Sequence, residues 1–351
     1  MRELLTKVFR RAGCGKSARP VRRGGGGPQI YSVTLRPTLP VQWFSVTEAG
    51  ILDRLKRRIL LPRHSRVVMG IGDDCAIYRG RGASEDLLLT TDLLIEGVHF
   101  LRSTHRAADI GHKALARGMS DVAAMGGEPS FCLLSLALPT AISAKWIDSF
   151  YSGLLELAEA HGVVLAGGDL ARATQITCDI VCVGTVPRGQ ALLRRGAHPR
   201  DLIYVSGALG GSALGLATNR GAARQRHLRP EPRVALGRYL RKVLHATAAM
   251  DLSDGLSIDL ARMCQASGTS ALLDHVRLFP GAVFPGATME QALHGGEDYE
   301  LLFAVRPEAR VPSAFHGIPL TRIGTMLKGP EAGVLLDGKP LPVLGHDHFR
   351  D

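Results

Sequence analysis

The sequence contains no apolar run long enough to cross a lipid bilayer, so we expect a soluble protein without a membrane partner. It also lacks any C-x-x-C pair among its six cysteines, which are Cys14, Cys75, Cys132, Cys178, Cys182 and Cys264. Three of these cysteines lie inside apolar, strand-like runs. Unpaired cysteines in such places argue against a zinc site or a disulfide framework and favour reduced core thiols in a cytoplasmic protein.

A basic stripe with interleaved aromatic side chains is also missing from the body of the chain, although the net charge is +11. Residues 1–45 hold nine Lys/Arg and one acid, whereas the remaining residues hold 34 Lys/Arg and 31 Asp/Glu. The excess charge therefore belongs to the amino-terminal segment, and we expect no nucleic-acid partner. A nucleic-acid-binding function through this segment remains an alternative, which predicts salt-sensitive binding that is lost when residues 1–44 are removed.

Residues 1–44 are Arg-rich and acid-poor, contain the run RRGGGGP and show no apolar periodicity beyond a short basic helix at the start. We predict a disordered tail. It is either an organelle transit peptide or the product of a translation start assigned too far upstream. The run GCGKS resembles the end of a phosphate-binding P-loop, but Arg10 stands where glycine is required and no apolar strand precedes it.

The rest of the chain alternates between patterns typical of helices and of strands. Apolar spacing predicts helices near 46–60 and 109–125 and a third capped by Ser143, and short apolar runs predict strands at 66–71, 75–78, 86–95, 131–139, 162–169 and 176–186. Residues 187–201 show little periodicity and predict a junction. A chain of 351 residues is long enough for two domains. We therefore predict an α/β or α+β fold with domains at 45–186 and 187–351.

Acidic residues recur where the predicted strands end, and strand ends are where α/β proteins collect their sites. These acids are Asp73, Asp74, Asp92, Asp169, Asp251 and Asp254, while Asp121 lies on a helical stripe of small apolar residues. Each acid alone is explained by a turn or a helix cap. If they converge, two carboxylates about 4 Å apart repel by about 4 kcal/mol at an effective dielectric constant of about 20. A cluster of hard oxygen ligands without nearby His or Cys predicts Mg²⁺ and a polyphosphate ligand.

Two further segments allow a functional or a structural interpretation. The run MDLSDGL predicts a helix that begins near Asp254 and ends at Gly268, whose amino terminus and Ser253 could meet a phosphate. Alternatively, Ser253 or Asp254 only caps this helix. The run SGALGGSA at 206–213 predicts either a phosphate loop or a tight turn between a strand and a helix.

Seven motifs together resemble the thiamine-monophosphate kinase family in order and spacing, over about residues 44–349. They are GIGDDCA, TTDLLIEGVHF, SDVAAMGGEP, AGGD, RRGAHPRD, DLSDGL and GGEDYELLF. The resemblance implies Mg²⁺-dependent transfer of the γ-phosphoryl group of ATP to thiamine monophosphate, the final step of thiamine diphosphate biosynthesis. It also implies the two-domain fold of aminoimidazole ribonucleotide synthetase, with ATP between the domains. A homodimer is expected, in which the amino-terminal sheets of two subunits join into a barrel.

The resemblance also assigns roles to individual residues. Several Mg²⁺ ions would be held by Asp74, Thr90, Thr91, Asp92, Asp121, Asp169, Asp251 and Asp254, with Asp121 and Asp254 as catalytic residues. ATP would contact Gly168, Asp169, Arg194 and Ser253. Thiamine monophosphate would contact His99, Glu297 and His346, although an isolated His99 or a Glu297 in a turn also has a structural explanation.

Two positions depart from the family pattern. Leu170 follows Asp169 where relatives often have a hydroxyl residue, and His346 stands where an aromatic residue usually stacks on the thiamine moiety. A neutral imidazole offers less stacking area, which predicts weaker substrate affinity or a somewhat different acceptor.

The missing catalytic His or Lys is no objection to the kinase reaction. A phosphate monoester is already largely dianionic at neutral pH because its second pKa is about 6. The reaction needs charge neutralisation and in-line alignment, which metals and an arginine supply. Another enzyme of the superfamily, such as selenophosphate synthetase, is the alternative. Against it, Cys14 lies outside the matching region, and no reactive cysteine occupies a glycine-rich loop at the start of that region.

Overall fold

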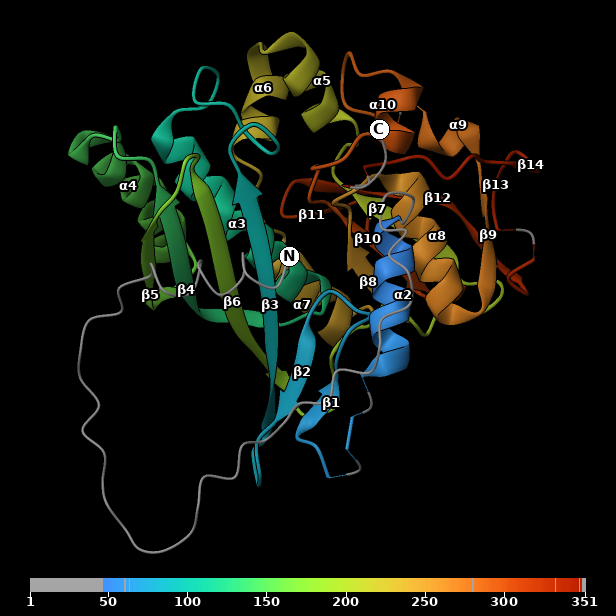
Figure 1. The fold of residues 1–351 in the computed structure, drawn as a ribbon. Coiled ribbons are helices and arrows are strands. Elements are labelled where there is room, and N and C mark those ends of the chain that lie inside the picture. Colours follow the sequence, from blue (N-terminus) through green and yellow to red (C-terminus); the bar gives the residue numbers. More distant parts are fainter. Residues whose placement is uncertain are drawn as a thin grey trace, which may run out of the picture. The chain divides into compact units, whose positions relative to one another are not determined.

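The computed structural model describes residues 47–59, 61–62, 64–279, 281–331, 333–346 and 348. These residues belong to one compact unit, Ser45–Asp351, which is built around two mixed sheets (Figure 1). The predicted tail disorder, the short initial helix, the GCGKS run and Cys14 lie outside the described residues. Within the described part, no helix is long and apolar enough to span a membrane.

The first sheet has six strands in the order β1-β2-β3-β6-β4-β5. Its strands are β1 (Val67–Met69), β2 (Ala76–Arg79), β3 (Glu85–Ile95), β4 (Glu128–Leu138), β5 (Val164–Arg172) and β6 (Thr177–Pro187). All neighbouring strands are antiparallel except the parallel pair of β4 and β5. Along β3, Leu88 and Leu94 are fully buried whereas Leu93 is 45% exposed. One face of this sheet is therefore packed, and the other is open.

Helices α3 (Ala107–Ala124) and α4 (Ala144–Ala160) belong to the packed side. The side chain of Ser143 accepts a hydrogen bond from the amide of Trp146, which confirms the predicted cap of α4. The two helices touch through glycine, because a Cβ atom at Gly153 would lie only 1.9 Å from the carbonyl oxygen of Ala108. This close crossing holds α3 firmly between α4 and the sheet.

The second sheet has eight strands. Seven of them follow the order β14-β13-β9-β12-β7-β10-β8, and the short strand β11 pairs with β12 outside this order. They are β7 (Leu202–Ser206), β8 (Ala248–Asp251), β9 (Thr269–Leu273), β10 (Leu301–Val305), β11 (Ala314–Phe315), β12 (Ile318–Lys328), β13 (Val334–Leu336) and β14 (Lys339–Pro340). The associated helices are α5 (Gly211–Thr218), α6 (Gly221–Leu228), α7 (Val234–Lys242), α8 (Leu256–Ser267), α9 (His275–Leu278) and α10 (Met289–His294). Alternate residues of β10 enter two cores, Leu302 with α8 and Phe303 with α7.

Helix α2 (Glu48–Arg58) begins the described part of the chain and confirms the first predicted helix. The hydroxyl of Thr47 caps it by accepting a hydrogen bond from the amide of Gly50. Leu55 and Ile59, which define its apolar spacing, are 40% and 50% exposed. This helix is therefore amphipathic, although its apolar side is only partly covered.

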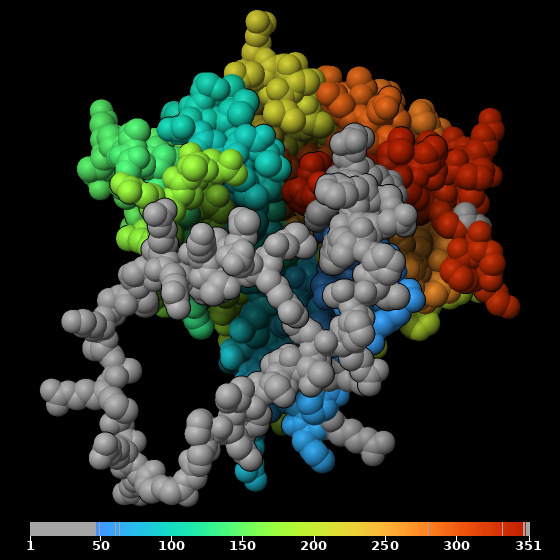
Figure 2. All heavy atoms as spheres, in the orientation of Figure 1, coloured from blue at the N-terminus to red at the C-terminus, as the bar shows by residue number. Residues whose placement is uncertain are grey.

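The predicted mixed α/β class is confirmed. In the space-filling view, the green part of the chain, which includes β4 to β6, and the orange to red part, which includes β9 to β14, occupy neighbouring regions of the surface (Figure 2). No helix or strand occurs between the end of β6 and the start of β7, where the sequence predicts a junction. The division into domains at residues 186 and 187 stays a prediction, since both sheets share one compact unit. The five described cysteines are buried and free, which confirms that they are core thiols.

Candidate active site

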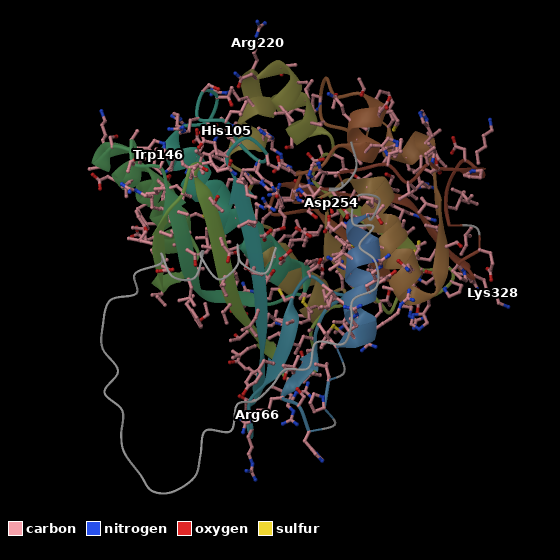
Figure 3. All side chains as sticks on the ribbon, viewed as in Figure 1. Arg66, His105, Trp146, Arg220, Asp254 and Lys328 are labelled. Carbon is pink, nitrogen blue, oxygen red and sulfur yellow. The ribbon has the colours of Figure 1, made fainter. Side chains whose placement is uncertain are left out.

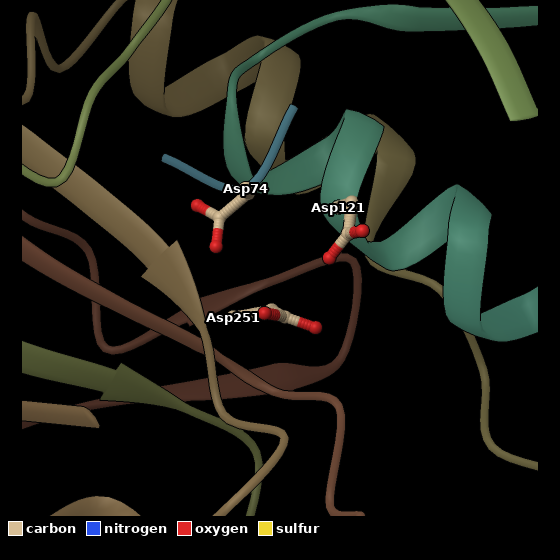
Figure 4. Close-up of side chains that lie close together, drawn as sticks. All are labelled: Asp74, Asp121 and Asp251. Atoms are coloured by element: carbon tan, nitrogen blue, oxygen red, sulfur yellow. The ribbon is translucent and has the colours of Figure 1, made fainter. Parts of the chain in front are cut away.

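Three carboxylates from separate parts of the chain meet where the two sheets adjoin (Figure 4). Asp74 follows β1, Asp121 lies on α3 and Asp251 ends β8. One oxygen of each lies within 4.8 Å of the others, and Asp74 and Asp251 are only 8% and 2% exposed. The predicted convergence is therefore confirmed for these three acids, which are 47 and 130 positions apart along the chain.

Burial makes this cluster electrostatically costly. Burial raises the pKa of all three carboxyl groups, and neighbouring acids raise the pKa of Asp121 and Asp251 further. At an effective dielectric constant of about 20, two carboxylates at this separation repel by roughly 3 kcal/mol when both are ionised. The oxygen Oδ2 of Asp74 is buried and has no hydrogen-bond partner among the described residues. A cation with a preference for oxygen ligands would satisfy both features.

Each carboxylate of the cluster is oriented by a neighbour. The hydroxyl of Thr90 donates to Oδ2 of Asp121, and the hydroxyl of Ser120 donates to Oδ2 of Asp251 at 2.6 Å. No hydrogen bond from a described residue reaches Oδ1 of Asp121 or Oδ1 of Asp251, so these oxygens can bind a ligand.

Arg194 forms an ion pair with Asp74 of the cluster. Its Nε donates to Oδ1 of Asp74 at 3.0 Å, and its amide lies 3.2 Å from both carboxylate oxygens of Asp73. Burial and the charge of Asp74 raise the pKa of Asp73 to about 7. The adjacent acids therefore differ in their partners: Asp73 faces a backbone amide, and Asp74 faces a guanidinium and the other two acids.

The alternation of side chains along β3 separates the predicted ligands from one another. Thr90 and Asp92 lie on the side of α3, where Arg117 donates from Nη2 to Oδ1 of Asp92 at 3.0 Å. The side chain of Thr91 lies on the open face instead and donates to Oδ1 of Asp179 at 2.6 Å. Thr91 is thus not brought to the three acids through its side chain.

Asp169 also lies away from the cluster. It is opposite Ser135 on β4, and Ser135 is opposite Asp179 on β6, so the register places all three on the open face. The preceding Gly168 has no room for a side chain, because a Cβ atom there would lie 1.8 Å from the carbonyl oxygen of Leu134. Within one chain, the side chains of Asp169 and Asp121 therefore lie on opposite faces of the sheet and do not meet.

The connection between β8 and α8 contains Asp254, which is labelled in Figure 3. Its carboxylate accepts a hydrogen bond from Nη1 of Arg262 at 2.5 Å. The amides of Asp254 and Gly255 both donate to Oδ2 of the buried Asp259 at 3.1 Å. The interpretation of Ser253 or Asp254 as the helix cap is therefore wrong, since Asp259 reaches back from inside α8 to serve these amides.

His99 lies in the turn that follows β3, with one ring nitrogen available. Its Nδ1 accepts a hydrogen bond from the amide of Ile95 at 3.0 Å, which places the proton on Nε2. Burial lowers the pKa of His99 to about 4, so the ring is neutral. Its Nε2 is buried and has no partner among the described residues. His99 is therefore a preorganised neutral donor.

The carboxyl-terminal segment passes this histidine. The ring of His348 lies 5.1 Å from that of His99 and 4.5 Å from that of His346. The amide of His346 also donates to the carbonyl oxygen of Asp254 at 3.1 Å. The sequence predicts that His346 contacts the acceptor. In the structure it lies between the connection from β8 to α8 and His348, whose ring neighbours His99.

Glu297 precedes β10 and bonds to α3. Its Oε2 accepts from Nζ of Lys113 at 2.8 Å and lies 3.4 Å from Nδ1 of His227. Burial alone would raise the pKa of Glu297, but Lys113 and His227 hold it at about 2. The amide of Glu297 donates to the carbonyl oxygen of Ser253 at 2.7 Å. This bond connects Glu297, predicted to contact thiamine monophosphate, with Ser253, predicted to contact ATP.

Asp298 faces the start of α5. Its carboxylate accepts from the amides of Gly210 at 2.6 Å and Ser212 at 3.0 Å. These amides belong to the run SGALGGSA. If this run were a phosphate loop, its N–H groups would have to be free to bind the phosphate. The run is therefore a tight turn whose amides are already bonded, and Asp298 has a structural role.

Sequence reasoning missed several residues that orient the site, namely Lys113, Arg117, Ser120 and Asp259. Lys113 and Arg117 precede Asp121 by eight and four positions, so the helical repeat places all three on one side of α3. This spacing was a usable signal. The small apolar residues that surround Asp121 on the helix obscure it.

Comparison with known proteins gives consistent results. The family "AIR synthase related protein, N-terminal domain" matches residues 72–186. The thiamine-monophosphate kinase of Escherichia coli (strain K12) is 40% identical over 306 residues, which cover 81% of this chain and 92% of the relative. The enzyme of the same name from Bacillus subtilis (strain 168) is 35% identical over 312 residues, covering 82% of this chain and 95% of the relative.

Solved structures agree with the sequence comparison. The structure described as "AaThiL complexed with AMPPCP and TMP" is 32% identical with a TM-score of 0.76 and covers 89% of this chain and 100% of that chain. Thiamine-monophosphate kinase from Stenotrophomonas maltophilia K279a is 38% identical with a TM-score of 0.67, covering 84% and 98%. Hydrogenase maturation protein HypE in complex with ATP, at 16% identity and a TM-score of 0.60, covers 75% of this chain and 86% of that chain and shares the fold alone.

Proposed function

The chain belongs to the thiamine-monophosphate kinase family, and we propose that it transfers the γ-phosphoryl group of ATP to thiamine monophosphate, giving thiamine diphosphate and ADP. The observation that carries this proposal is the meeting of Asp74, Asp121 and Asp251 in a chain that is related to these kinases over most of its length. The relative solved with AMPPCP and TMP supports both substrates. The names of the curated relatives favour this reaction over that of selenophosphate synthetase and over a nucleic-acid-binding role.

The donor set fits Mg²⁺. It consists of buried carboxylates with raised pKa values and includes the unpartnered Oδ2 of Asp74, and it contains no His or Cys ligand. We propose Asp74, Asp121 and Asp251 as the central ligands. Thr90, Asp92 and Asp254 extend the set that would hold several ions, and Thr91 and Asp169, which lie on the open face, would join it only across the subunit interface proposed below. When bound, Mg²⁺ neutralises the charge between two phosphate groups that otherwise repel each other.

The chain's own residues prepare this site. Arg194 holds Asp74 in place, and its remaining donors are available to a phosphate oxygen. Thr90 and Ser120 fix the rotamers of Asp121 and Asp251, so the carboxylates need not reorganise when the ligand arrives. An oxygen of the acceptor phosphate attacks the γ-phosphorus, and the bond to the bridging oxygen of ADP breaks. No general base is needed because the acceptor is already a dianion.

The thiamine side of the acceptor is proposed to lie near His99, Glu297 and His346. His99 offers a neutral Nε2 donor, Glu297 offers a carboxylate and His346 offers an exposed ring from the carboxyl-terminal segment. His346 and Glu297 lie beside Asp254 and Ser253, whose backbone oxygens accept hydrogen bonds from their amides. The proposed acceptor and nucleotide residues are thus linked by direct hydrogen bonds.

We further propose a cytoplasmic homodimer that forms through the open face of the first sheet and closes it into a barrel between subunits. Leu93 and Leu133 are 45% and 37% exposed on this face. Asp169 lies on the same face, and Gly168 precedes it. Their proposed contacts to ATP and Mg²⁺ would then arise at the interface between subunits instead of within one chain.

The test is a coupled assay of ADP release with ATP, Mg²⁺ and thiamine monophosphate, in which the product is identified as thiamine diphosphate by chromatography. The matched variants are Asp121→Asn, in the cluster, and Asp148→Asn, on the exposed side of α4. Asn keeps an oxygen that can accept from Thr90, so the fold of the variant should be preserved. We expect Asp121→Asn to lower kcat by a factor of about 100 or more, since one charged ligand is removed from the reacting centre.

The control variant Asp148→Asn should keep the wild-type kcat. A folded wild-type protein that binds Mg-ATP but forms no thiamine diphosphate would contradict the proposed reaction and direct attention to His346 and a different acceptor. Full activity of Asp121→Asn would contradict the role of the acidic cluster.

A further inference from the structure

Lys113 is a fully buried lysine on α3, with an exposed fraction of 0%. Among the described residues, its Nζ has one hydrogen-bond and ion-pair partner, Oε2 of Glu297 at 2.8 Å. Burial lowers the pKa of Lys113, whereas Glu297 counteracts this shift. An ammonium group is costly to bury without a partner, so its presence here requires an explanation beyond core packing.

Glu297 is held in an unusual conformation. Its φ angle is +64°, in the left-handed region that residues other than glycine seldom adopt. The loop persists because its neighbours are fixed: Asp298 accepts from the amides at the start of α5, and Glu300 bonds to Arg233 at 2.6 and 2.8 Å. Strain of this kind is kept where the surrounding structure determines the geometry completely.

The two oxygens of Glu297 differ in their surroundings. Oε2 is occupied by Lys113 and lies 3.4 Å from Nδ1 of His227. No hydrogen bond from a described residue reaches Oε1, and the Glu297 side chain is 25% exposed whereas that of Lys113 is completely covered. A ligand can therefore approach Glu297 but not Lys113.

Other charged groups around this pair do not replace Lys113. The rings of His99, His105 and His227 are neutral, since burial lowers the pKa of each, to about 4 for His99 and His227. Arg117, one helical turn further along α3, donates to Asp92 and to the carbonyl oxygen of Leu93. His105, one of these neutral rings, lies just before α3 and is labelled in Figure 3. Lys113 is thus the one cationic hydrogen-bond partner of Glu297 in the described part of the chain.

We propose that Lys113 is the positioning residue of the acceptor site: it fixes the Glu297 carboxylate through Oε2 and leaves Oε1 to bind the thiamine part of thiamine monophosphate. This inference rests on the proposed function and deepens it. The thiamine moiety carries a cationic thiazolium ring and an amino group, and a partly buried, ionised carboxylate with one oxygen left unpaired binds either one well. Lys113 acts through Glu297 and touches neither the phosphate nor the metal site.

The experiment compares Lys113→Met, which keeps the length of the side chain but removes its charge, with Lys145→Met on the exposed surface of α4. Titration calorimetry measures the Kd for thiamine monophosphate and, separately, for Mg-AMPPCP, so that affinity is obtained without turnover. We expect the Kd for thiamine monophosphate to rise at least tenfold in Lys113→Met. The Kd for Mg-AMPPCP should stay within twofold of the wild type, and Lys145→Met should leave both values unchanged.

The pH dependence separates positioning from a purely structural role. Without Lys113, only the weaker charge effects of His227 and Arg117 still oppose burial of the Glu297 carboxylate, so its pKa should rise and it should take up a proton at a higher pH. The ratio of the Kd for thiamine monophosphate in Lys113→Met to that in the wild type should therefore grow between pH 7.5 and pH 5.5. This ratio cancels the titration of the substrate's own phosphate. A constant ratio of one across this range would overturn the proposal.

A double variant keeps the test valid if Lys113→Met alone fails to fold. Lys113→Met with Glu297→Gln removes both members of the pair and leaves no unpaired buried charge. If Lys113 acts only through Glu297, the double variant should bind thiamine monophosphate as weakly as Glu297→Gln alone, with no added pH dependence. A further tenfold loss in the double variant would show that Lys113 contacts the ligand directly, which contradicts the positioning role.

The outcomes also separate this inference from the proposed function. Wild-type protein that makes thiamine diphosphate, together with Lys113→Met that binds thiamine monophosphate normally, would overturn the role of Lys113 alone. Wild-type protein that binds thiamine monophosphate without turnover would overturn the kinase reaction, while the affinities still decide the role of Lys113. A wild-type protein that binds no thiamine monophosphate would overturn both.

Discussion

His227 illustrates how one buried side chain can make the stability of this protein depend on pH. The ring is 4% exposed, its Nδ1 lies 3.0 Å from the hydroxyl of Ser212, and its Nε2 has no partner among the described residues. Burial, together with the charge of Lys113, lowers the pKa of His227 from 6.5 to about 4. The neighbouring Glu297 opposes this shift and His105 reinforces it. The native state therefore resists protonation, whereas the unfolded chain does not.

The sign of the pH effect follows from linkage. Between pH 6.5 and about 4, the unfolded state binds a proton at this position and the native state does not, so the free energy of unfolding falls as the pH falls. We expect His227 to account for about 2 kcal/mol of the stability lost between pH 7 and pH 5. Urea unfolding at both pH values should show that His227→Asn reduces this loss by about that amount. The exposed His275→Asn serves as the control, and an equal pH dependence in wild type and His227→Asn would contradict the prediction.

At the scale of one element, strand β3 has two different uses. Its packed face carries Thr90 and Asp92 toward α3, while its open face carries Thr91 and Leu93. A strand can do this because successive side chains point to opposite faces of the sheet. The same strand therefore contributes both to the acidic site and to the proposed subunit interface.

The open face leads to a prediction about assembly. A charged residue in the centre of a sheet-to-sheet interface is expensive to bury, so Leu133→Arg should shift the wild-type dimer to a monomer. Light scattering coupled to size-exclusion chromatography measures the mass directly. Leu155→Arg replaces a leucine of similar exposure on α4 and should remain a dimer. A monomeric wild type, or a Leu133→Arg variant that stays dimeric, would show that this face is not the interface.

At the scale of the whole molecule, the acidic cluster joins the two sheets. Asp74 belongs to the first sheet's loops, Asp251 ends a strand of the second sheet, and Asp121 lies on the helix between them. Without a cation, burial and mutual repulsion oppose ionisation of these groups and weaken the contact between the sheets. A ligand that binds only the native arrangement should therefore stabilise the entire described unit.

Removal of the metal tests this expectation without any measurement of activity. At about one hundred times its Kd, Mg²⁺ should raise the free energy of unfolding by about 2.7 kcal/mol relative to EDTA. The corresponding rise in Tm is about 4 °C for a chain of this size. Differential scanning calorimetry should show this rise in the wild type and in Asp148→Asn but not in Asp251→Asn. If Asp251→Asn responds to Mg²⁺ as the wild type does, the ion binds elsewhere.

Local patterns in the sequence were sufficient for most of the secondary structure and for the family. Apolar periodicity predicted α3, α4 and the strands of the first sheet, because burial of one face imposes a repeat of 3.6 or 2 residues on the chain. The same local chemistry identified Asp74, Asp121 and Asp251 as site residues, because an acid at a strand end or on a packed helix face conflicts with its surroundings. Motif order alone was enough to indicate the kinase family.

Only the tertiary structure decided which of these residues meet and which partners they have. Thr91 and Asp169 have the same local signature as Thr90 and Asp92, yet sheet register places them on the opposite face. In the sequence, Lys113 has the pattern of an ordinary helical residue. Its partner Glu297 lies 184 positions away, and only the packing of α3 brings the two together. The physical reason is that side-chain partnership depends on contacts between segments distant along the chain. A local pattern fixes the face of an element, but not what lies against that face.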